Sequence, residues 1–106
     1  MSVYIQVITA TGSKSEAEKI SRAVVESRLA GCAQVLGPIT SVYRWKGELE
    51  ETEEWLCIMK SRTELYKDLE SIIRQNHSYE IPEILATPIT EASDTYLAWL
   101  KGELKT

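Results

Sequence analysis

Residues 32–60 read CAQVLGPITSVYRWKGELEETEEWLCIMK, and this stretch predicts two long strands joined by a tight turn. The predicted segments are residues 32–36 continuing as 39–45, the turn Lys46-Gly47, and residues 49–60. Gly37-Pro38 interrupts the first strand in a way that is typical of a β-bulge or a bend. A strand of this length spans roughly 45 Å, more than twice the usual span. We therefore expect the hairpin to project beyond its own domain.

A strand and a helix are predicted before this hairpin. Residues 3–9 are β-branched, aromatic and mostly apolar, which is typical of a central strand. The turn at residues 11–15 contains two pairs with capping-box spacing, Ser13 with Glu16 and Ser15 with Glu18, so a helix begins there. Its predicted buried stripe consists of Ala17, Ile20 and Val24. Gly31 suits the left-handed position that ends such a helix.

Two helices and an edge strand are predicted after the hairpin. Ser61 and Glu64 have capping-box spacing and open a helix that ends near Asn76. Its apolar face is formed by Leu65, Leu69, Ile72 and Ile73. Residues 81–89 form the next strand, and we place it at a sheet edge because its two prolines, Pro82 and Pro88, cannot donate ladder hydrogen bonds. Ser93 or Asp94 caps a final helix that contains Tyr96, Leu97, Trp99 and Leu100 and stops at Gly102.

The order β-α-β-β-α-β plus a helix predicts an α/β (α+β) protein of ferredoxin-like architecture. The length fits one domain covering residues 1–106. The outer part of the hairpin carries Tyr43, Trp45 and Trp55, which are costly to leave in water. We therefore expect the chain to assemble with copies of itself.

Composition excludes several functional classes. Twelve Lys and Arg residues against sixteen Asp and Glu give a net charge of −4, and the basic residues are scattered, so we expect no nucleic-acid partner. No apolar run approaches the length of a membrane span, and residues 1–4 lack the pattern of a signal peptide. Cys32 and Cys57 are too few for a disulfide framework. We expect two reduced thiols in the core of a cytoplasmic protein.

Two acidic or phosphate-like motifs have simpler interpretations. Residues 12–15, Gly-Ser-Lys-Ser, resemble part of a phosphate-binding loop, but the first glycine of that motif is missing, so we interpret them as a capped turn. Five glutamates crowd residues 48–54 without the alternating ligands of a calcium loop. A solvated strand edge explains them.

His77 is the only histidine, which limits metal and hydrolase chemistry. The cysteines lack C-x-x-C spacing, and no serine lies in a G-x-S-x-G turn, so neither a zinc finger nor a triad hydrolase is expected. An imidazole and a carboxylate suit copper, zinc or nickel, and the partner of His77 is expected to be Glu80, Glu83 or a residue of another chain, with Glu83 the first candidate. A short ligand list predicts weak binding. A purely structural role of this loop histidine stays an open alternative.

Five segments in order resemble the CutA family, the divalent-cation tolerance proteins, over nearly the whole chain. These segments are residues 28–35 (RLAGCAQV), 39–47 (ITSVYRWKG), 54–61 (ending Met59-Lys60-Ser61), 77–84 (HSYEIPEI) and 96–100 (YLAWL). The resemblance implies a ferredoxin-like fold in a tight homotrimer, similar in architecture to PII signalling proteins. It also implies tolerance of divalent metals such as copper, with no enzymatic reaction. Some bacterial members carry a cysteine late in the first strand as a proposed copper ligand, whereas this chain has Ile8-Thr9-Ala10.

On this resemblance, the leading hypothesis is a non-enzymatic trimer that binds a metal ion or small ligand between subunits. The cleft is expected to be formed by Gln34, Tyr43, Trp45, Lys60, His77, Tyr79 and Glu83. Lys60 follows the apolar run 56–59 and should meet an anion or a carboxylate, or simply pair with a glutamate. Two alternatives stay open. One is a trimeric scaffold or PII-like signalling module that docks proteins, and the other is an acylphosphatase-like hydrolase, for which Lys14 is the nearest phosphate-binding candidate.

Overall fold

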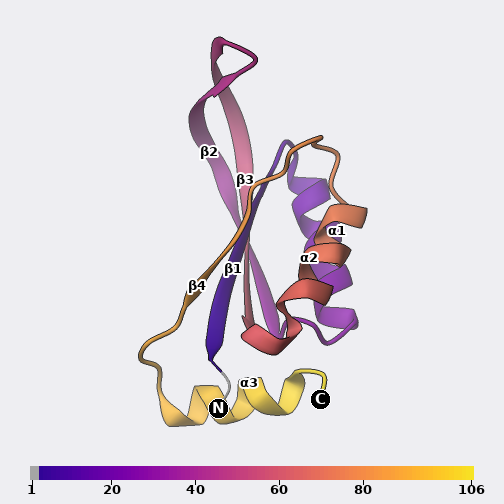
Figure 1. Ribbon diagram of the computed structural model, residues 1–106, viewed down its shortest axis with the longest axis vertical. Helices are drawn as coiled ribbons and strands as arrows, with labels where there is room; N and C mark the ends of the chain where they lie inside the picture. The colour runs from indigo at the N-terminus through magenta and orange to yellow at the C-terminus, as the bar shows by residue number, and fades with distance from the viewer. Residues whose placement is uncertain (1–2) are drawn as a thin grey trace.

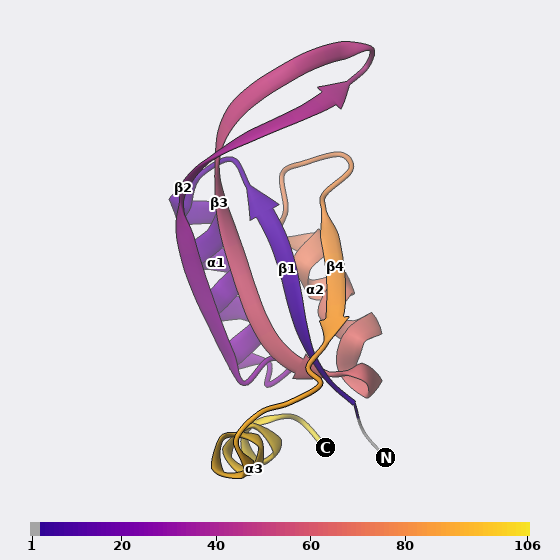
Figure 2. The same ribbon diagram turned by 90° about the vertical axis from the view of Figure 1, so that its left-hand side faces the viewer.

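The computed structural model describes residues 3–106 as a four-stranded antiparallel sheet with α1 and α2 on one face and α3 at one end (Figures 1 and 2). The elements are β1 (Tyr4–Thr11), α1 (Lys14–Glu26), β2 (Cys32–Trp45), β3 (Glu48–Arg62), the 3-10 turn η1 (Thr63–Leu65), α2 (Tyr66–Gln75), β4 (Ile84–Pro88) and α3 (Asp94–Glu103). The strand order β2-β3-β1-β4 confirms the predicted ferredoxin-like arrangement. Met1 and Ser2, part of the segment without a signal-peptide pattern, lie outside the described residues.

The long hairpin is present as predicted. Trp45 pairs with Glu48, and the two turn residues between them, Lys46 and Gly47, have φ angles of 51° and 83°. Positive φ at both positions matches the twist of a tight hairpin turn. The ladder shifts register between Leu36 and Ile39, which confirms the bulge at Gly37-Pro38. The outer half of the hairpin extends past both helices, and the longest dimension of the chain is 44 Å (Figure 1).

The core lies between the sheet and helices α1 and α2. The predicted stripe of α1 is fully buried, as are Leu69 and Ile73 of α2. These side chains belong to one cluster with the inward residues of β1 and β3, among them Val7 and Met59. Ser13 caps α1, and its Oγ accepts a hydrogen bond from the backbone N–H of Glu16. In residues 3–106, no helix has both the length and the apolarity needed to cross a bilayer.

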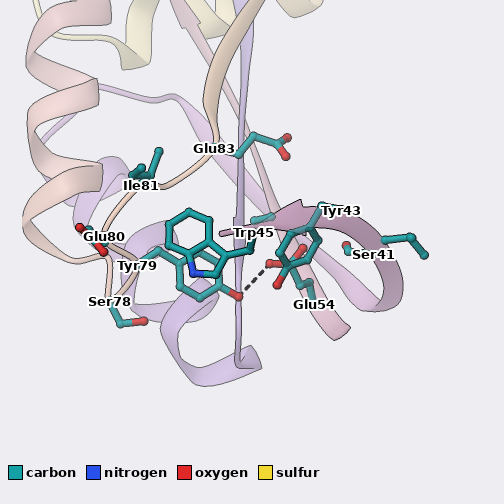
Figure 3. A pocket seen from close by; sticks show the side chains of 11 residues that line it. Ser41, Tyr43, Trp45, Glu54, Ser78, Tyr79, Glu80, Ile81 and Glu83 are labelled. Carbon is teal, nitrogen blue, oxygen red and sulfur yellow. Dashed lines mark hydrogen bonds between the residues drawn. The ribbon is translucent and has the colours of Figure 1, made fainter. Parts of the chain in front are cut away.

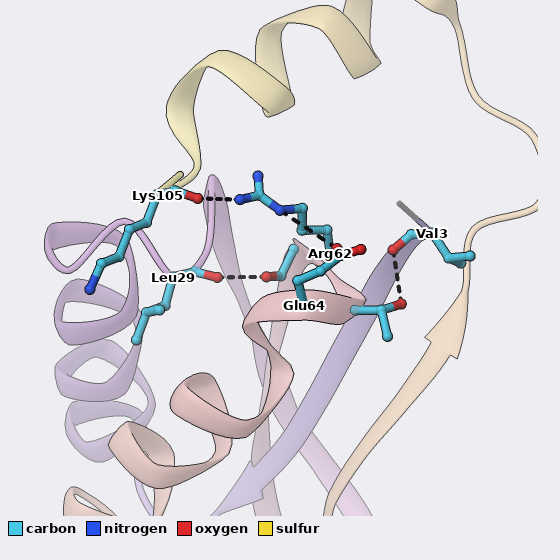
Figure 4. A network of polar contacts seen from close by, with 7 residues as sticks. Val3, Leu29, Arg62, Glu64 and Lys105 are labelled. Carbon is cyan, nitrogen blue, oxygen red and sulfur yellow. Dashed lines mark hydrogen bonds and ion pairs between the residues drawn. The ribbon is translucent and has the colours of Figure 1, made fainter. Parts of the chain in front are cut away.

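The C-terminal end of α3 is hydrogen-bonded to the end of the sheet that lies away from the hairpin tip. The Arg28 guanidinium donates to the carbonyl oxygens of Gly102 and Glu103, at 2.8 and 3.0 Å. The N–H of Lys105 donates to the carbonyl of Arg28, and its carbonyl accepts from Arg62 (Figure 4). Basic side chains thus satisfy carbonyls that the helix end leaves free.

Gly31 does not take the left-handed position after α1, so that prediction was wrong. The helix ends at Glu26, and Arg28, with a φ of 63°, adopts the left-handed conformation instead. Gly31 is needed for a different reason, because a Cβ atom there would lie 2.3 Å from Cδ1 of Leu100. The glycine permits the close approach of α3.

The capping box predicted at Ser61 and Glu64 does not form. Ser61 stays in β3, paired with Ile5, and its buried hydroxyl donates to the carbonyl of Leu29 at 2.6 Å (Figure 4). The start of α2 follows the turn η1 and has no side-chain cap. Because the β1–β3 ladder keeps Ser61 in the strand, its hydroxyl bonds to the carbonyl of Leu29 and does not cap a helix.

The last strand is shorter than the predicted residues 81–89. β4 spans Ile84–Pro88 and lies at the sheet edge beside β1, as its prolines indicated. Pro82 precedes the strand, in the loop that faces the hairpin. α3 continues one residue past Gly102 and is capped by Ser93, whose Oγ accepts from the N–H of Tyr96.

Both cysteines are free, but only one is a core residue. Cys57 is fully buried, and burial raises the pKa of its thiol. Cys32 is half-buried, contrary to the prediction, and its Sγ lies 3.4 Å from the hydroxyl oxygen of Tyr96. Burial, together with this contact, raises the pKa of Tyr96 to about 12. At neutral pH the phenol therefore stays uncharged.

Candidate functional site

A cavity of about 580 Å³ lies where the outer half of the hairpin faces the loop before β4 (Figure 3). Its size is typical of a small-molecule site. The chemistry of its lining is carried by three aromatic side chains and three carboxylates: Tyr43, Trp45, Tyr79, Glu54, Glu80 and Glu83. No Lys, Arg or His is part of the described lining.

Two of the aromatic side chains come from the outer end of β2. Tyr43 and Trp45 are two residues apart, so they project from the same face of the strand. They keep exposed fractions of 38% and 36%. The Tyr43 hydroxyl accepts from Oγ1 of Thr52 on β3, at 3.3 Å. The Lys46 ammonium lies 5.7 Å from the ring centroid of Trp45, within range of a cation–π interaction.

Tyr79 and Glu54 connect the loop to the hairpin. The Tyr79 hydroxyl donates to Oε2 of Glu54 at 2.8 Å (Figure 3), and the Glu54 residue is only 7% exposed. Burial, and then the hydrogen bond to Glu54, raise the pKa of Tyr79 well above its ordinary value. The phenol therefore remains protonated at neutral pH and donates this hydrogen bond. Gly12 leaves room for this phenol, because a Cβ atom there would lie 3.2 Å from its oxygen.

His77 fastens the loop to β1. Its Nε2 lies 2.9 Å from the carbonyl oxygen of Ala10 and 3.1 Å from Oγ1 of Thr9. Its Nδ1 accepts from the N–H of Tyr79 at 3.2 Å. The acceptor at Nδ1 assigns the proton to Nε2, which donates to Ala10. Both ring nitrogens are thus used inside the chain, and His77 positions Tyr79.

Glu16 provides a second fastening of the same loop. One carboxylate oxygen accepts from the N–H of Ser78 at 2.7 Å, and the other accepts from its hydroxyl at 3.1 Å. Hydrogen bonds to an ionised acceptor are stronger than hydrogen bonds between two neutral groups. The first turn of α1 thereby fixes the wall of the cavity that Tyr79 forms.

The structure divides the predicted site residues into two groups. Tyr43, Trp45, Tyr79 and Glu83 all line the cavity. Gln34, Lys60 and His77 lie outside its lining, and the Lys60 ammonium donates to the Gln34 amide oxygen at 2.8 Å. The partner that Lys60 finds in this chain is therefore an amide and not a carboxylate.

Sequence reasoning missed Glu54. It was grouped with the solvated glutamates of residues 48–54, yet it is buried. Nearer the core, the buried residues of β3 are odd-numbered, as in Cys57 and Met59, whereas Glu54 is even-numbered. The change of face coincides with the bulge at Gly37-Pro38, which pairs opposite this part of β3. The bulge, visible in the sequence as Gly37-Pro38, was therefore the signal that the buried face of β3 changes near Glu54.

Comparison with known proteins identifies a family. The sequence model of the family described as CutA1 divalent ion tolerance protein matches residues 5–103. The divalent-cation tolerance protein CutA of Thermus thermophilus is 39% identical over 95 residues, which cover 90% of this chain and 92% of that protein. The chloroplastic protein CutA of Arabidopsis thaliana is 36% identical over 95% of this chain, which spans 56% of that protein.

Solved structures agree with the sequence comparison. The structure of CutA1 from Oryza sativa superposes with a TM-score of 0.94 at 31% identity, covering 97% of this chain and 94% of that one. The Thermus thermophilus divalent cation tolerance protein gives a TM-score of 0.91 at 36% identity, covering 99% and 100%. The long hairpin and the loop before β4 lie within residues 5–103, which the family model matches.

Proposed function

The chain belongs to the CutA1 divalent ion tolerance family, and from that premise we propose that it is a non-enzymatic trimer that binds a cation in the cavity between its hairpin and the loop before β4. The observation that carries the proposal is the lining of three carboxylates without a basic side chain. Within residues 3–106, the ion pairs Arg62–Glu64 and Arg74–Glu70 do not involve the cavity carboxylates, so these three form no ion pair there. Glu54 is buried and Glu80 and Glu83 are exposed, and a buried carboxylate in particular favours a cationic partner.

Divalent copper or zinc is the proposed ion, and we expect it to bind weakly. Within residues 3–106, no three His, Cys, Asp or Glu side chains are grouped closely enough to hold one metal ion. Glu83 is the proposed first ligand. His77 would join it only by giving up its bond to Ala10 or to the N–H of Tyr79. Water must then complete the coordination sphere.

We expect Glu83→Gln to weaken zinc and copper binding by about tenfold, because it removes the charge and one ligand oxygen. Calorimetry on the assembled protein measures this. Glu91→Gln is the matched control, since Glu91 is exposed and outside the lining. In wild type, binding should weaken as the pH is lowered, because protons compete with the metal for an imidazole nitrogen. His77→Ala should remove that pH-dependent part. Equal affinities in wild type, Glu83→Gln and His77→Ala would contradict the proposed ligands.

Apolar side chains on the hairpin and on β4 support the proposed trimer. Leu36, Val42 and Leu49 of the hairpin and Leu85 of β4 are exposed in the single chain. Both β2 and β4 are edge strands whose outer backbone groups can pair with another chain. We propose that these edges meet between copies of the chain.

Light scattering at micromolar concentration should give three times the chain mass of 12.0 kDa. Leu36→Glu should shift the mass toward the single chain, because it places a charge in the proposed interface. Val25→Glu changes an exposed apolar residue on α1 and should leave the assembly intact. A wild-type mass of one chain would rule out the trimer.

A docking scaffold is the second candidate function. The rings of Tyr96 and Trp99 are exposed side by side on α3, with centroids 5.6 Å apart. Exposed aromatic pairs of this kind are common in protein interfaces. The acylphosphatase alternative finds no support in the turn after β1, where Ser13 caps α1 and Lys14 is exposed.

A cytoplasmic location stays a proposal. The names of similar proteins place them in different compartments, since the Arabidopsis relative is called chloroplastic and the Archaeoglobus fulgidus one periplasmic.

A further inference from the structure

The cavity between the hairpin and the loop before β4 is wider than a bare metal ion requires. Its volume of about 580 Å³ would hold a ligand of several heavy atoms. Its carboxylates come from separate parts of the chain, Glu54 from β3, and Glu80 and Glu83 from the loop. In the described chain they form no group of three that could hold one metal ion. The negative charge is therefore spread around the walls.

The remaining walls are aromatic. Tyr43 and Trp45 border the cavity from the hairpin, and Tyr79 borders it from the loop (Figure 3). Among the described residues, none of these three rings stacks on another, and the ring contact of Tyr79 is with His77. The three rings therefore do not cover one another. The Lys46 ammonium already lies over the Trp45 indole, 5.7 Å from its centroid and within cation–π range, so a ligand cation would share that ring with this exposed lysine or displace it.

Aromatic faces and dispersed carboxylates together recognise a particular chemical class. We propose that the cavity binds a small organic cation with a quaternary or alkylated ammonium head, which the rings of Tyr43, Trp45 and Tyr79 surround and the three carboxylates neutralise. A methylated ammonium ion is weakly hydrated and presents apolar CH groups, so it gains from aromatic contact. The hydrogen bond between Tyr79 and Glu54 fixes one ring and one buried charge before the ligand arrives. This inference rests on the proposed function only in using the same cavity.

Choline chloride and its neutral isostere 3,3-dimethyl-1-butanol provide a matched pair of probes. Both have the same shape, and only choline carries the charge. Calorimetry on the assembled protein should show choline binding at least tenfold more tightly than the alcohol. Equal affinities would overturn the proposal, because the cavity would then be merely apolar. No choline binding at millimolar concentration would also overturn it.

Variants locate the site. Trp45→Leu should weaken choline binding by about tenfold, whereas Trp99→Leu, the same change on exposed α3, should leave it unchanged. Glu80→Gln tests the charge at an exposed position that makes no hydrogen bond within the described chain, so it should weaken choline and not the alcohol. If circular dichroism shows that Trp45→Leu does not fold, the site is tested by comparing choline and the neutral alcohol on wild type and on Glu80→Gln. Unchanged choline affinity in the folded cavity variants would contradict the assignment.

A zinc titration separates this proposal from the proposed function. Zinc binding without choline binding would overturn the organic-cation site and leave the metal site standing. Choline binding without zinc binding would support the organic-cation site and contradict the metal proposal. If both bind and choline is displaced by zinc, the two cations share the cavity.

Discussion

Replacement of Ile20 by alanine is expected to lower the free energy of unfolding by about 2–5 kcal/mol. Ile20 is fully buried on α1, in the cluster that joins this helix to β1, β3 and α2. The change removes three side-chain carbons from a close-packed region, which loses the transfer free energy of those groups and leaves a cavity. A single domain is stabilised by only about 5–15 kcal/mol, so the effect is a large fraction of the total.

Val25→Ala provides the control on the same helix. Val25 is 38% exposed, so its truncation should change the free energy of unfolding by no more than about 0.5 kcal/mol. Guanidinium unfolding followed by circular dichroism measures both variants. The chain concentration must be equal, because assembly contributes to apparent stability. Similar midpoints for the two variants would show that the α1 stripe is not packed as described.

Gly31→Ala is expected to destabilise the protein by about 1–3 kcal/mol through overpacking. The new Cβ would lie 2.3 Å from Cδ1 of Leu100, which is fully buried and cannot move into solvent. The N–H of Gly31 also donates to the carbonyl of Lys60 at 2.9 Å, so the backbone cannot easily retreat. The clash should push α3 away from the end of the sheet.

Gly102→Ala tests the same substitution where space is free. Nothing lies within 4 Å of a Cβ atom at Gly102, and the residue is inside α3. Alanine favours a helix over glycine by about 1 kcal/mol, so this variant should be as stable as wild type or more stable. Thermal unfolding distinguishes the two. If Gly31→Ala matched Gly102→Ala, the close approach of α3 would be refuted. Leu100→Ala in the Gly31→Ala background should give a non-additive change, because the two residues are in contact.

The sequence predicted the elements whose signals are local. The hairpin followed from two long strand patterns around Lys46-Gly47, and the bulge followed from Gly37-Pro38. The first cap, Ser13 with the N–H of Glu16, and the buried stripe of α1 follow from spacing along one helix. Four of the site residues expected from the family resemblance, Tyr43, Trp45, Tyr79 and Glu83, line the cavity, because the outer hairpin and the loop before β4 face each other.

The errors have a common physical origin. Ser61 and Gly31 were assigned to helix ends because their types and spacing fit caps, but each is fixed by a distant partner. Ser61 bonds to the carbonyl of Leu29, and Gly31 faces Leu100. A cap can be read from neighbours in the chain, whereas such a contact depends on how separate elements pack.

The sequence by itself determined the order of strands and helices, the length and turn of the hairpin, and the edge position of the proline-bearing strand, since all of these depend on periodicity and backbone chemistry over a few residues. Only the tertiary structure decided that Glu54 is buried against Tyr79 and that both ring nitrogens of His77 are engaged within the chain. It also decided that Lys60 meets Gln34 outside the cavity. Apart from the bond between Nδ1 of His77 and the N–H of Tyr79, these contacts join residues 25 to 67 positions apart. The twist of the hairpin and the packing of the loop bring such residues together, and no local pattern encodes either.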